Sequence, residues 1–297
     1  MVKQSMNKKK KTTRAKARKA RKASLGLAEA PSLGKGKCKF CKGVVKRGDP
    51  CKVEWINPGR YKLKVCPECY SKGVDVSVPD TQAECDATLA LLRADFGRML
   101  VKYGINIDGP IDVSNPFQYY GDNAGTVGKL LEGNYSSKEW KKKHPRTNDR
   151  CPFSNFFFTR GGVTYDIPGI GKFKTTEAII MTWKASVMGD GAILRCFKDH
   201  GDLVAGTASK NLGKWVTPFV EKKWCPKVVA MYVTLIKWDQ CPVFQAEMRR
   251  IHAEGYTSIH ECSPNDSIWG TGSAVGEPLG DGENILGKAQ TTILNLL

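Results

Sequence analysis

The chain has 297 residues, of which 41% are hydrophobic and 26% are charged. This composition is typical of a soluble globular protein, and the length suits one large domain or a catalytic domain with a small module. No apolar run approaches the roughly 18 residues of a membrane-spanning helix, and the N-terminus lacks the apolar segment of a secretory signal. We therefore expect no membrane partner and no secretion, but a cytoplasmic or nucleic-acid-associated protein, nuclear if the source is a eukaryote.

The net charge of +18 is concentrated at the N-terminus. Residues 1–24 contain eight Lys, three Arg and no acidic residue. Such a segment cannot bury a core, so residues 1–36 are predicted to form a disordered basic tail. Its expected partner is a polyanion such as nucleic acid, with a nuclear-import signal or a solubilising tail as alternatives. The residues expected to contact phosphates are Lys8, Lys9, Lys10, Lys11, Arg14, Arg18 and Arg21.

Four of the eleven cysteines have the spacing of a zinc site. They form two CxxC pairs separated by 24 residues, a pattern typical of tetrahedral structural zinc. The expected ligands are Cys38, Cys41, Cys66 and Cys69. A module this small needs its metal to fold, so residues 37–73 are predicted to be a four-cysteine zinc finger without a free position for catalysis. Surrounding Lys and Arg residues favour phosphate contact, and packing against the next domain is the alternative.

An apolar stripe predicts a long helix after the finger. Apolar residues from Cys85 to Tyr103 recur at alternating spacings of three and four, and Thr81 with Glu84 forms a capping box at the start. Within residues 74–114, this helix is expected to connect the finger to a catalytic domain or to mediate self-association.

The rest of the chain is predicted to alternate between strands and helices. Residues 119–120 and 153–158 are strand candidates, and the polar segment 121–150 between them is expected to be a surface insertion. Thr175 and the residues after it are expected to open a helix. The helix dipole should favour the ionised form of Glu177, which suits a general base better than a general acid, and plain capping is the alternative.

The stretch from Glu261 to Gly287 is rich in groups that hold a flat, polar ligand. Its glycines let backbone N–H groups converge on an anion or a carbonyl oxygen. Trp269 is suited to stacking on a base or sugar, and Asp266 to proton transfer or to holding a hydroxyl. A Gly-rich turn whose Trp fills the core is the alternative interpretation.

Set together, several short motifs in the second half of the chain resemble the NADAR family. In chain order they are residues 152–156, Thr176-Glu177, Lys184-Ala185, Glu261, Asn265-Asp266, Trp269-Gly270, Gly282, Asn284 and Leu286-Gly287. The likeness covers about residues 115–297, and the family includes YbiA-like N-glycosidases of riboflavin-pathway intermediates. It implies a compact, α-rich α+β fold, and hydrolysis of an N-glycosidic bond between a base-like group and ribose phosphate or ADP-ribose.

The resemblance also implies a set of site residues. Glu177 and Asp266 become the catalytic carboxylates. For cleavage of a C1′–N bond we assign Glu177 as the base and Asp266 as the acid or the ribose-binding group. The substrate-binding residues would be Asn155, Lys184, Trp269, Gly270, Asn284 and Gly287. No metal is expected for catalysis, so zinc would be a structural cofactor only. The family commonly has His after the helix-opening Glu, and Ala178 stands there in this chain, which leaves substrate choice and activity open.

Three functions follow as alternatives. The first is an N-glycosidase that removes ADP-ribose from a DNA base, with the tail and finger delivering it to nucleic acid. The second is the same reaction on a free riboflavin-pathway intermediate or a related nucleotide metabolite. The third is a non-catalytic protein that binds nucleic acid or ADP-ribose. The basic tail and finger favour the first over the second, and the carboxylates Glu177 and Asp266 argue against the third; the sequence does not predict the oligomeric state.

Overall fold

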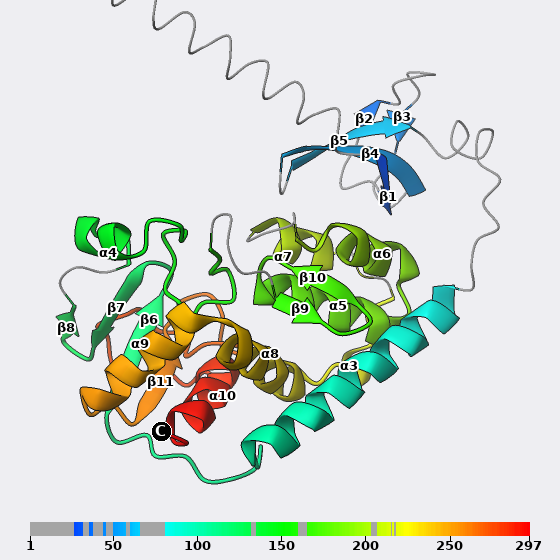
Figure 1. Cartoon of the computed structure of the whole chain (residues 1–297). Coiled ribbons are helices and arrows are strands. Elements are labelled where there is room, and N and C mark those ends of the chain that lie inside the picture. The colour runs from blue at the N-terminus through cyan, green and yellow to red at the C-terminus, as the bar shows by residue number, and fades with distance from the viewer. Residues whose placement is uncertain are drawn as a thin grey trace, which may run out of the picture. The chain divides into compact units, whose positions relative to one another are not determined.

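The computed structural model divides the chain into two units, Met1–Pro79 and Asp80–Leu297 (Figure 1). In the second unit it describes residues 81–131, 135–159, 165–202, 207–214, 216 and 218–297. In the first unit it describes five strands, which are β1 (Leu27–Pro31), β2 (Gly36–Lys37), β3 (Val44–Val45), β4 (Pro50–Asn57) and β5 (Arg60–Val65).

The strands of the first unit form two antiparallel sheets. One sheet has the order β1-β4-β5, and the other pairs β2 with β3. The predicted zinc ligands and phosphate-binding residues of this unit all lie outside the described residues, so the zinc site and the basic tail stay predictions. These residues are Cys38, Cys41, Cys66, Cys69, Lys8, Lys9, Lys10, Lys11, Arg14, Arg18 and Arg21.

The second unit is a mixed domain of helices and small sheets. Its helices are α3 (Thr81–Tyr103), α4 (Lys138–Lys143), α5 (Thr176–Met188), α6 (Gly191–His200), α7 (Thr207–Gly213), the 3-10 turn η1 (Glu221–Lys223), α8 (Pro226–Gln240), α9 (Pro242–Ala253) and α10 (Ile285–Leu294). Its strands are β6 (Pro116–Tyr120), β7 (Asn123–Thr126), β8 (Lys129–Leu130), β9 (Tyr165–Ile167), β10 (Gly171–Phe173) and β11 (Ser258–Glu261).

A four-stranded sheet with the order β11-β6-β7-β8 joins two distant parts of the chain. β11 pairs in parallel with β6, in a register that sets Glu261 opposite Tyr119, whereas the other pairs are antiparallel. Side chains such as Phe117 and Ile259 are fully buried, and α10 packs on β11 and beside α8. The predicted strand at residues 119–120 is therefore confirmed. Its pairing with β11 fixes the position of Glu261 and of the loop that follows it.

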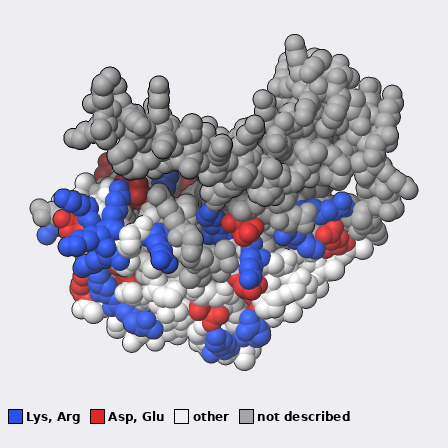
Figure 2. Space-filling model, turned by 45° about the horizontal axis from the view of Figure 1, so that its top comes forward, with Lys and Arg blue, Asp and Glu red and all other residues white. Residues whose placement is uncertain are grey.

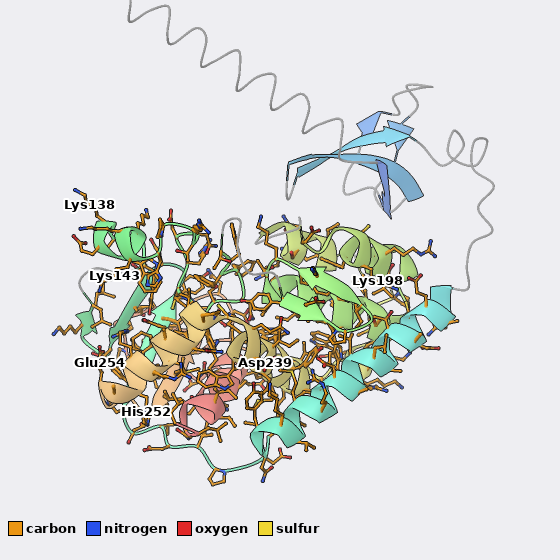
Figure 3. All side chains as sticks on the ribbon, in the orientation of Figure 1. Lys138, Lys143, Lys198, Asp239, His252 and Glu254 are labelled. Carbon is orange, nitrogen blue, oxygen red and sulfur yellow. The ribbon has the colours of Figure 1, made fainter. Side chains whose placement is uncertain are left out.

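Helix α5 lies at the centre of the helical layer, in contact with α3, α6, α7 and α8 (Figure 1). Phe96 of α3 packs edge-on to Trp183 of α5 and Tyr232 of α8, with ring centroids 6.3 and 5.8 Å away. At the C-terminal end of α3, the side chain of Asp239, labelled in Figure 3, accepts hydrogen bonds from Tyr103 and Lys102. The apolar stripe of α3 is thus a packing face against this layer. None of the described helices is both long and apolar enough to cross a membrane.

Two expectations about the region before α5 are wrong. Residues 153–156 form turns and a bend, and residues 157–158 belong to no strand. The buried side chains of Gln290 and Lys237 take up the carbonyl groups of Phe153 and Ser154, which a strand would pair. The segment 121–150 is more than a surface insertion, since it supplies β7, β8 and α4. Tyr135 within it is buried, and its hydroxyl donates a hydrogen bond to Glu247 on α9 at 2.6 Å.

Candidate active site

Three carboxylates from separate segments approach one another in the second unit. Glu177 is the second residue of α5, Glu261 is the last residue of β11, and Asp266 lies in the loop that follows. Burial raises the pKa of both glutamates, the negative charge of Asp266 raises it further, and Glu177 also raises the pKa of Glu261. Glu177 and Asp266, predicted as a pair, are therefore electrostatic neighbours.

The first turn of α5 is fixed to Asn155. The hydroxyl of Thr175 accepts a hydrogen bond from the N–H of Ala178 and so caps the helix. Thr176 donates its hydroxyl to Oδ1 of Asn155 at 3.0 Å, and the N–H of Glu177 donates to the carbonyl of Asn155 at 3.1 Å. Asn155, predicted to bind substrate, is thus buried against the start of the helix that carries Glu177.

Glu177 does not have the ionisation behaviour that its place in the helix predicts. Burial raises its pKa from an ordinary 4.5 to about 7, repulsion from Asp266 adds to this, and attraction to Lys210 and Lys184 opposes it. The expectation of a readily ionised carboxylate is wrong because the loss of water around a buried side chain outweighs the stabilising helix dipole. At neutral pH, Glu177 is therefore close to half-protonated.

Glu261 has a similar environment, although the sequence assigned it no role beyond its place in a motif. Burial raises its pKa to about 7, with further repulsion from Asp266 and Glu177. Lys210 and Lys237 act in the opposite direction. A carboxylate at the end of a short strand, five residues before Asp266, was the available signal, but its other charged neighbours, Glu177, Lys210 and Lys237, are distant in sequence.

Asp266 is held in one orientation by the loop after β11. Its Oδ1 accepts hydrogen bonds from the N–H groups of Trp269 and Ile268, at 2.9 and 3.2 Å. Gly270 then lets the loop return against the strand, since a Cβ there would lie only 2.5 Å from the carbonyl oxygen of Glu261. Of the predicted substrate-binding residues in this loop, Trp269 is half-buried and Gly270 is buried.

Asn284 and Gly287, both predicted to bind substrate, lie where α10 packs on β11. The side chain of Asn284 accepts a hydrogen bond from the N–H of Glu261 at 3.0 Å and donates one to the carbonyl of Ile259 at 3.2 Å. Gly287 is needed there because a Cβ would collide with the same carbonyl and with Asn284. Their contacts place the end of the strand, and with it Glu261.

Lysines supply positive charge beside the carboxylates. Lys184, two turns after Glu177 on α5, is half-buried and donates to the carbonyl of Gly213 at 3.0 Å, over the ring of Phe219. Burial lowers the pKa of Lys184, and Glu177 opposes this change. Lys210 of α7 is exposed, and its charge attracts both Glu177 and Glu261. Two cations next to ionisable acids can hold a phosphate or a developing negative charge.

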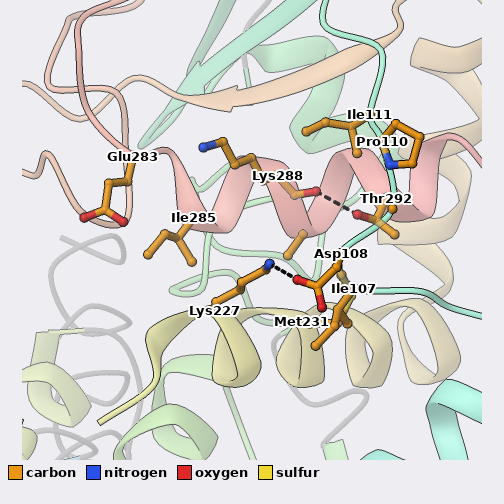
Figure 4. A pocket seen from close by; sticks show the side chains of 12 residues that line it. Ile107, Asp108, Pro110, Ile111, Lys227, Met231, Glu283, Ile285, Lys288 and Thr292 are labelled. Carbon is orange, nitrogen blue, oxygen red and sulfur yellow. Dashed lines mark hydrogen bonds and ion pairs between the residues drawn. The ribbon is translucent and has the colours of Figure 1, made fainter. Parts of the chain in front are cut away.

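A pocket of about 430 Å³ lies apart from these carboxylates, between α8, α10 and the segment after α3 (Figure 4). Met231, Ile285 and Ala289 give it an apolar wall, and an ion pair joins Lys227 to Asp108 at its edge. None of the three carboxylates lines it. Among the described residues, no group of three or more His, Cys, Asp or Glu is arranged to hold a metal ion.

Carboxyls whose pKa values lie near neutrality, next to lysines in a mixed α/β domain, are suited to proton transfer on a polar substrate. The NADAR domain matches the chain over residues 139–296. Because this match covers more than half of the 297 residues, the chain belongs to the NADAR family. That family is associated with N-glycosidase-type activity. No curated protein matches the chain.

We expect Glu177→Gln to stabilise the fold near pH 8 by roughly 3–4 kcal/mol, because each unit of raised pKa costs the ionised form about 1.4 kcal/mol. The folded-state pKa of about 7 exceeds the ordinary 4.5, so this cost is absent below the lower value and complete above the higher one. Urea unfolding of both proteins near pH 4 and pH 8 measures the difference. A gain of the same size at both pH values would contradict the raised pKa.

Proposed function

We propose that the chain hydrolyses an N-glycosidic bond between a base-like group and ribose phosphate or ADP-ribose. The observation that carries this proposal is that burial, with added repulsion from Asp266, raises the pKa of both Glu177 and Glu261 to about 7, which leaves a carboxyl proton at neutral pH. Two groups lower the barrier to breaking a C1′–N bond: a proton donor for the departing base and a negative charge near the ribose. A group of carboxylates with one proton available offers both.

The geometry favours a different division of roles from the one that the sequence suggests. A buried carboxyl with a pKa of about 7 is matched to proton donation at neutral pH, so we assign the general acid to Glu177, with Glu261 sharing its proton. Asp266, fixed by two backbone N–H groups, is assigned to the positive ribose and to the attacking water. The donor's proton goes to the base, and a water proton goes to Asp266 as the new C1′–OH forms.

An ADP-ribosylated DNA base is the substrate class that we favour. Helix α4 carries four exposed lysines, of which Lys141 pairs with Asp149 at 3.4 Å. Figure 2 shows Lys and Arg side chains gathered at this end of the domain, and Figure 3 shows Lys138 pointing away from it. Asn148, in the segment after α4, bonds to the carbonyl of Phe156 and the N–H of Phe158. These hydrogen bonds connect the basic surface of α4 to the segment that follows Asn155. A lysine-rich surface near the site suits a substrate with flanking phosphates.

We expect hydrolysis to depend on each carboxylate. Incubation with an ADP-ribosylated DNA oligonucleotide, followed by mass spectrometry of released ADP-ribose, should show turnover for the wild type. Glu177→Gln, Glu261→Gln and Asp266→Asn should each lose about a hundredfold or more, because each removes a proton-transfer group. Glu283→Gln is the matched control, since Glu283 is exposed and belongs to the separate pocket.

Other outcomes of this assay select the alternatives. Release of ribose phosphate from a free aminopyrimidine nucleotide, with none from DNA, would move the substrate to a riboflavin-pathway intermediate or related metabolite. No release from either substrate, with retained binding of ADP-ribose or DNA, would make the protein a binding protein. Near-normal turnover in Glu177→Gln would remove Glu177 from catalysis.

The pH dependence separates the two assignments of Glu177. If its protonated form is the acid, kcat should fall about tenfold per pH unit above a pKa near 7. If Glu177 is the base, as the helix position suggests, kcat should rise through the same pH range. Stopped assays between about pH 5.5 and 9 distinguish the two directions, and a rising limb would contradict our assignment.

We further propose that Cys38, Cys41, Cys66 and Cys69 hold a structural zinc ion and that the basic tail binds nucleic acid. The support is the spacing of the two CxxC pairs and the tail's charge. Metal analysis of the purified full chain should find about one zinc per molecule, and the double variant Cys38→Ser/Cys41→Ser should lose it. A wild-type chain without zinc, or a variant that retains it, would contradict this site.

A further inference from the structure

Helix α8 carries a lysine that is buried without a carboxylate bonded to it. Lys237 is only 1% exposed, and its ammonium lies 3.1 Å from the carbonyl oxygen of Pro152, 3.3 Å from that of Phe153 and 2.8 Å from that of Ser154. An ammonium has three N–H donors, so three carbonyls satisfy it fully, whereas a neutral amine has one donor too few. A buried cation is costly, and this one is compensated by backbone dipoles.

The three carbonyls belong to one turn, which other elements also hold. The carbonyl of Phe153 accepts further hydrogen bonds from Gln290 of α10 at 2.7 Å and from the hydroxyl of Tyr119 of β6 at 3.4 Å. The next residue after the turn is Asn155, which binds the first turn of α5. A short chain of contacts therefore leads from Lys237, through the turn, to the backbone N–H of Glu177.

The charge of Lys237 also reaches the carboxylates. The groups that face it are Cys151, Cys241 and Glu261, and burial lowers its pKa to about 8, so it stays protonated at neutral pH. Glu261 is in turn faced by Asp266, Glu177, Lys210, Lys237, Tyr119 and Cys262. The two lysines in this group lower the pKa of Glu261, against the effect of burial and of the other two carboxylates. Removing the charge of Lys237 should raise that pKa further.

We propose that Lys237 is a positioning residue of the proposed glycosidase site: its ammonium holds the turn at residues 152–154 that fixes Asn155 on α5, and its charge balances part of the negative charge of Glu261. The inference rests on the proposed function for its kinetic readout only. Lys237 itself touches no reacting atom. It acts through the turn and through Glu261.

The test compares Lys237→Gln, which is neutral but can still donate hydrogen bonds, with Gln290→Met. The second variant removes one hydrogen bond to the same turn and leaves the charge in place. It also removes a buried amide oxygen that has no partner among the described residues, so it should fold normally. Lys237→Met serves as a stronger variant if it folds, and thermal unfolding of each protein reports its overall stability.

Two measurements on the full chain test the proposal, the pH dependence of kcat and the hydrogen exchange of the Glu177 amide. In Lys237→Gln, the alkaline limb of kcat should move to higher pH, because Glu261 shares the proton of Glu177 and loses a positive charge that lowers its pKa. Gln290→Met should leave that limb unmoved and lower kcat by only a few-fold. Hydrogen exchange of the Glu177 amide should be at least about tenfold faster in Lys237→Gln, since a looser turn frees its acceptor, while core amides of α8 keep their wild-type rates.

The outcomes test the positioning role of Lys237 separately from the proposed N-glycosidase activity. If the wild type hydrolyses no substrate, the proposed function fails, and exchange at Glu177 still tests the positioning role. Unchanged Glu177 exchange in Lys237→Gln would overturn that role. A limb that moves equally in Lys237→Gln and Gln290→Met would overturn the charge effect, because only one of them alters the charge.

Discussion

Glu177, Glu261 and Asp266 carry like charges when ionised, and the surrounding structure has to hold them near one another. Glu177 is buried and Glu261 half-buried beside the half-buried Asp266, so loss of water and like charge both oppose ionisation of the two glutamates. Burial accordingly raises the pKa of both glutamates to about 7, and Asp266 adds to each shift. Such coupled acids exchange protons as a group, so the site has a proton available near neutral pH.

The fold brings Glu177 on α5 together with Glu261 and Asp266, which lie more than 80 residues later in β11 and the loop after it. Parallel pairing of β11 with β6 ends the strand at Glu261, and Asn284 of α10 holds that end. Asp266 is oriented by its own loop, whereas Glu177 depends on the capped start of α5. Each acid therefore sits on a segment that backbone hydrogen bonds hold in place. This rigidity opposes the repulsion that would otherwise separate the three groups.

Residue periodicity and helix capping predict those helices and strands that depend mainly on neighbouring residues. The helix from Thr81, the helix opened by Thr175 and the strand at residues 119–120 follow from periodicity and capping, and all three are present. The family was also recognisable, because its motifs occur in order along the chain and the domain match covers residues 139–296. The existence of these helices and the family of the chain can thus be predicted without knowledge of long-range contacts.

The predictions that were wrong depended on distant partners. Residues 153–158 look like a strand because they are rich in phenylalanine, but Lys237, 85 residues from Pro152, draws the carbonyls at the start of this segment into a turn. Likewise, the helix dipole alone predicts an ionised Glu177, and only its burial beside Asp266 reverses that expectation. Glu261 and Lys210 gain their relevance from the same long-range packing, which spacing along the chain does not reveal.

The most direct measurement is a carbon-13 NMR titration of the side-chain carboxyls of the full chain, with Glu177, Glu261 and Asp266 assigned through their amide variants. We expect Glu177 and Glu261 to titrate near pH 7, in two coupled steps. In Asp266→Asn, both steps should move to lower pH, because a neighbouring negative charge is gone. Titration of both Glu177 and Glu261 at ordinary values below about pH 5 would contradict the shared proton on which the proposed chemistry depends.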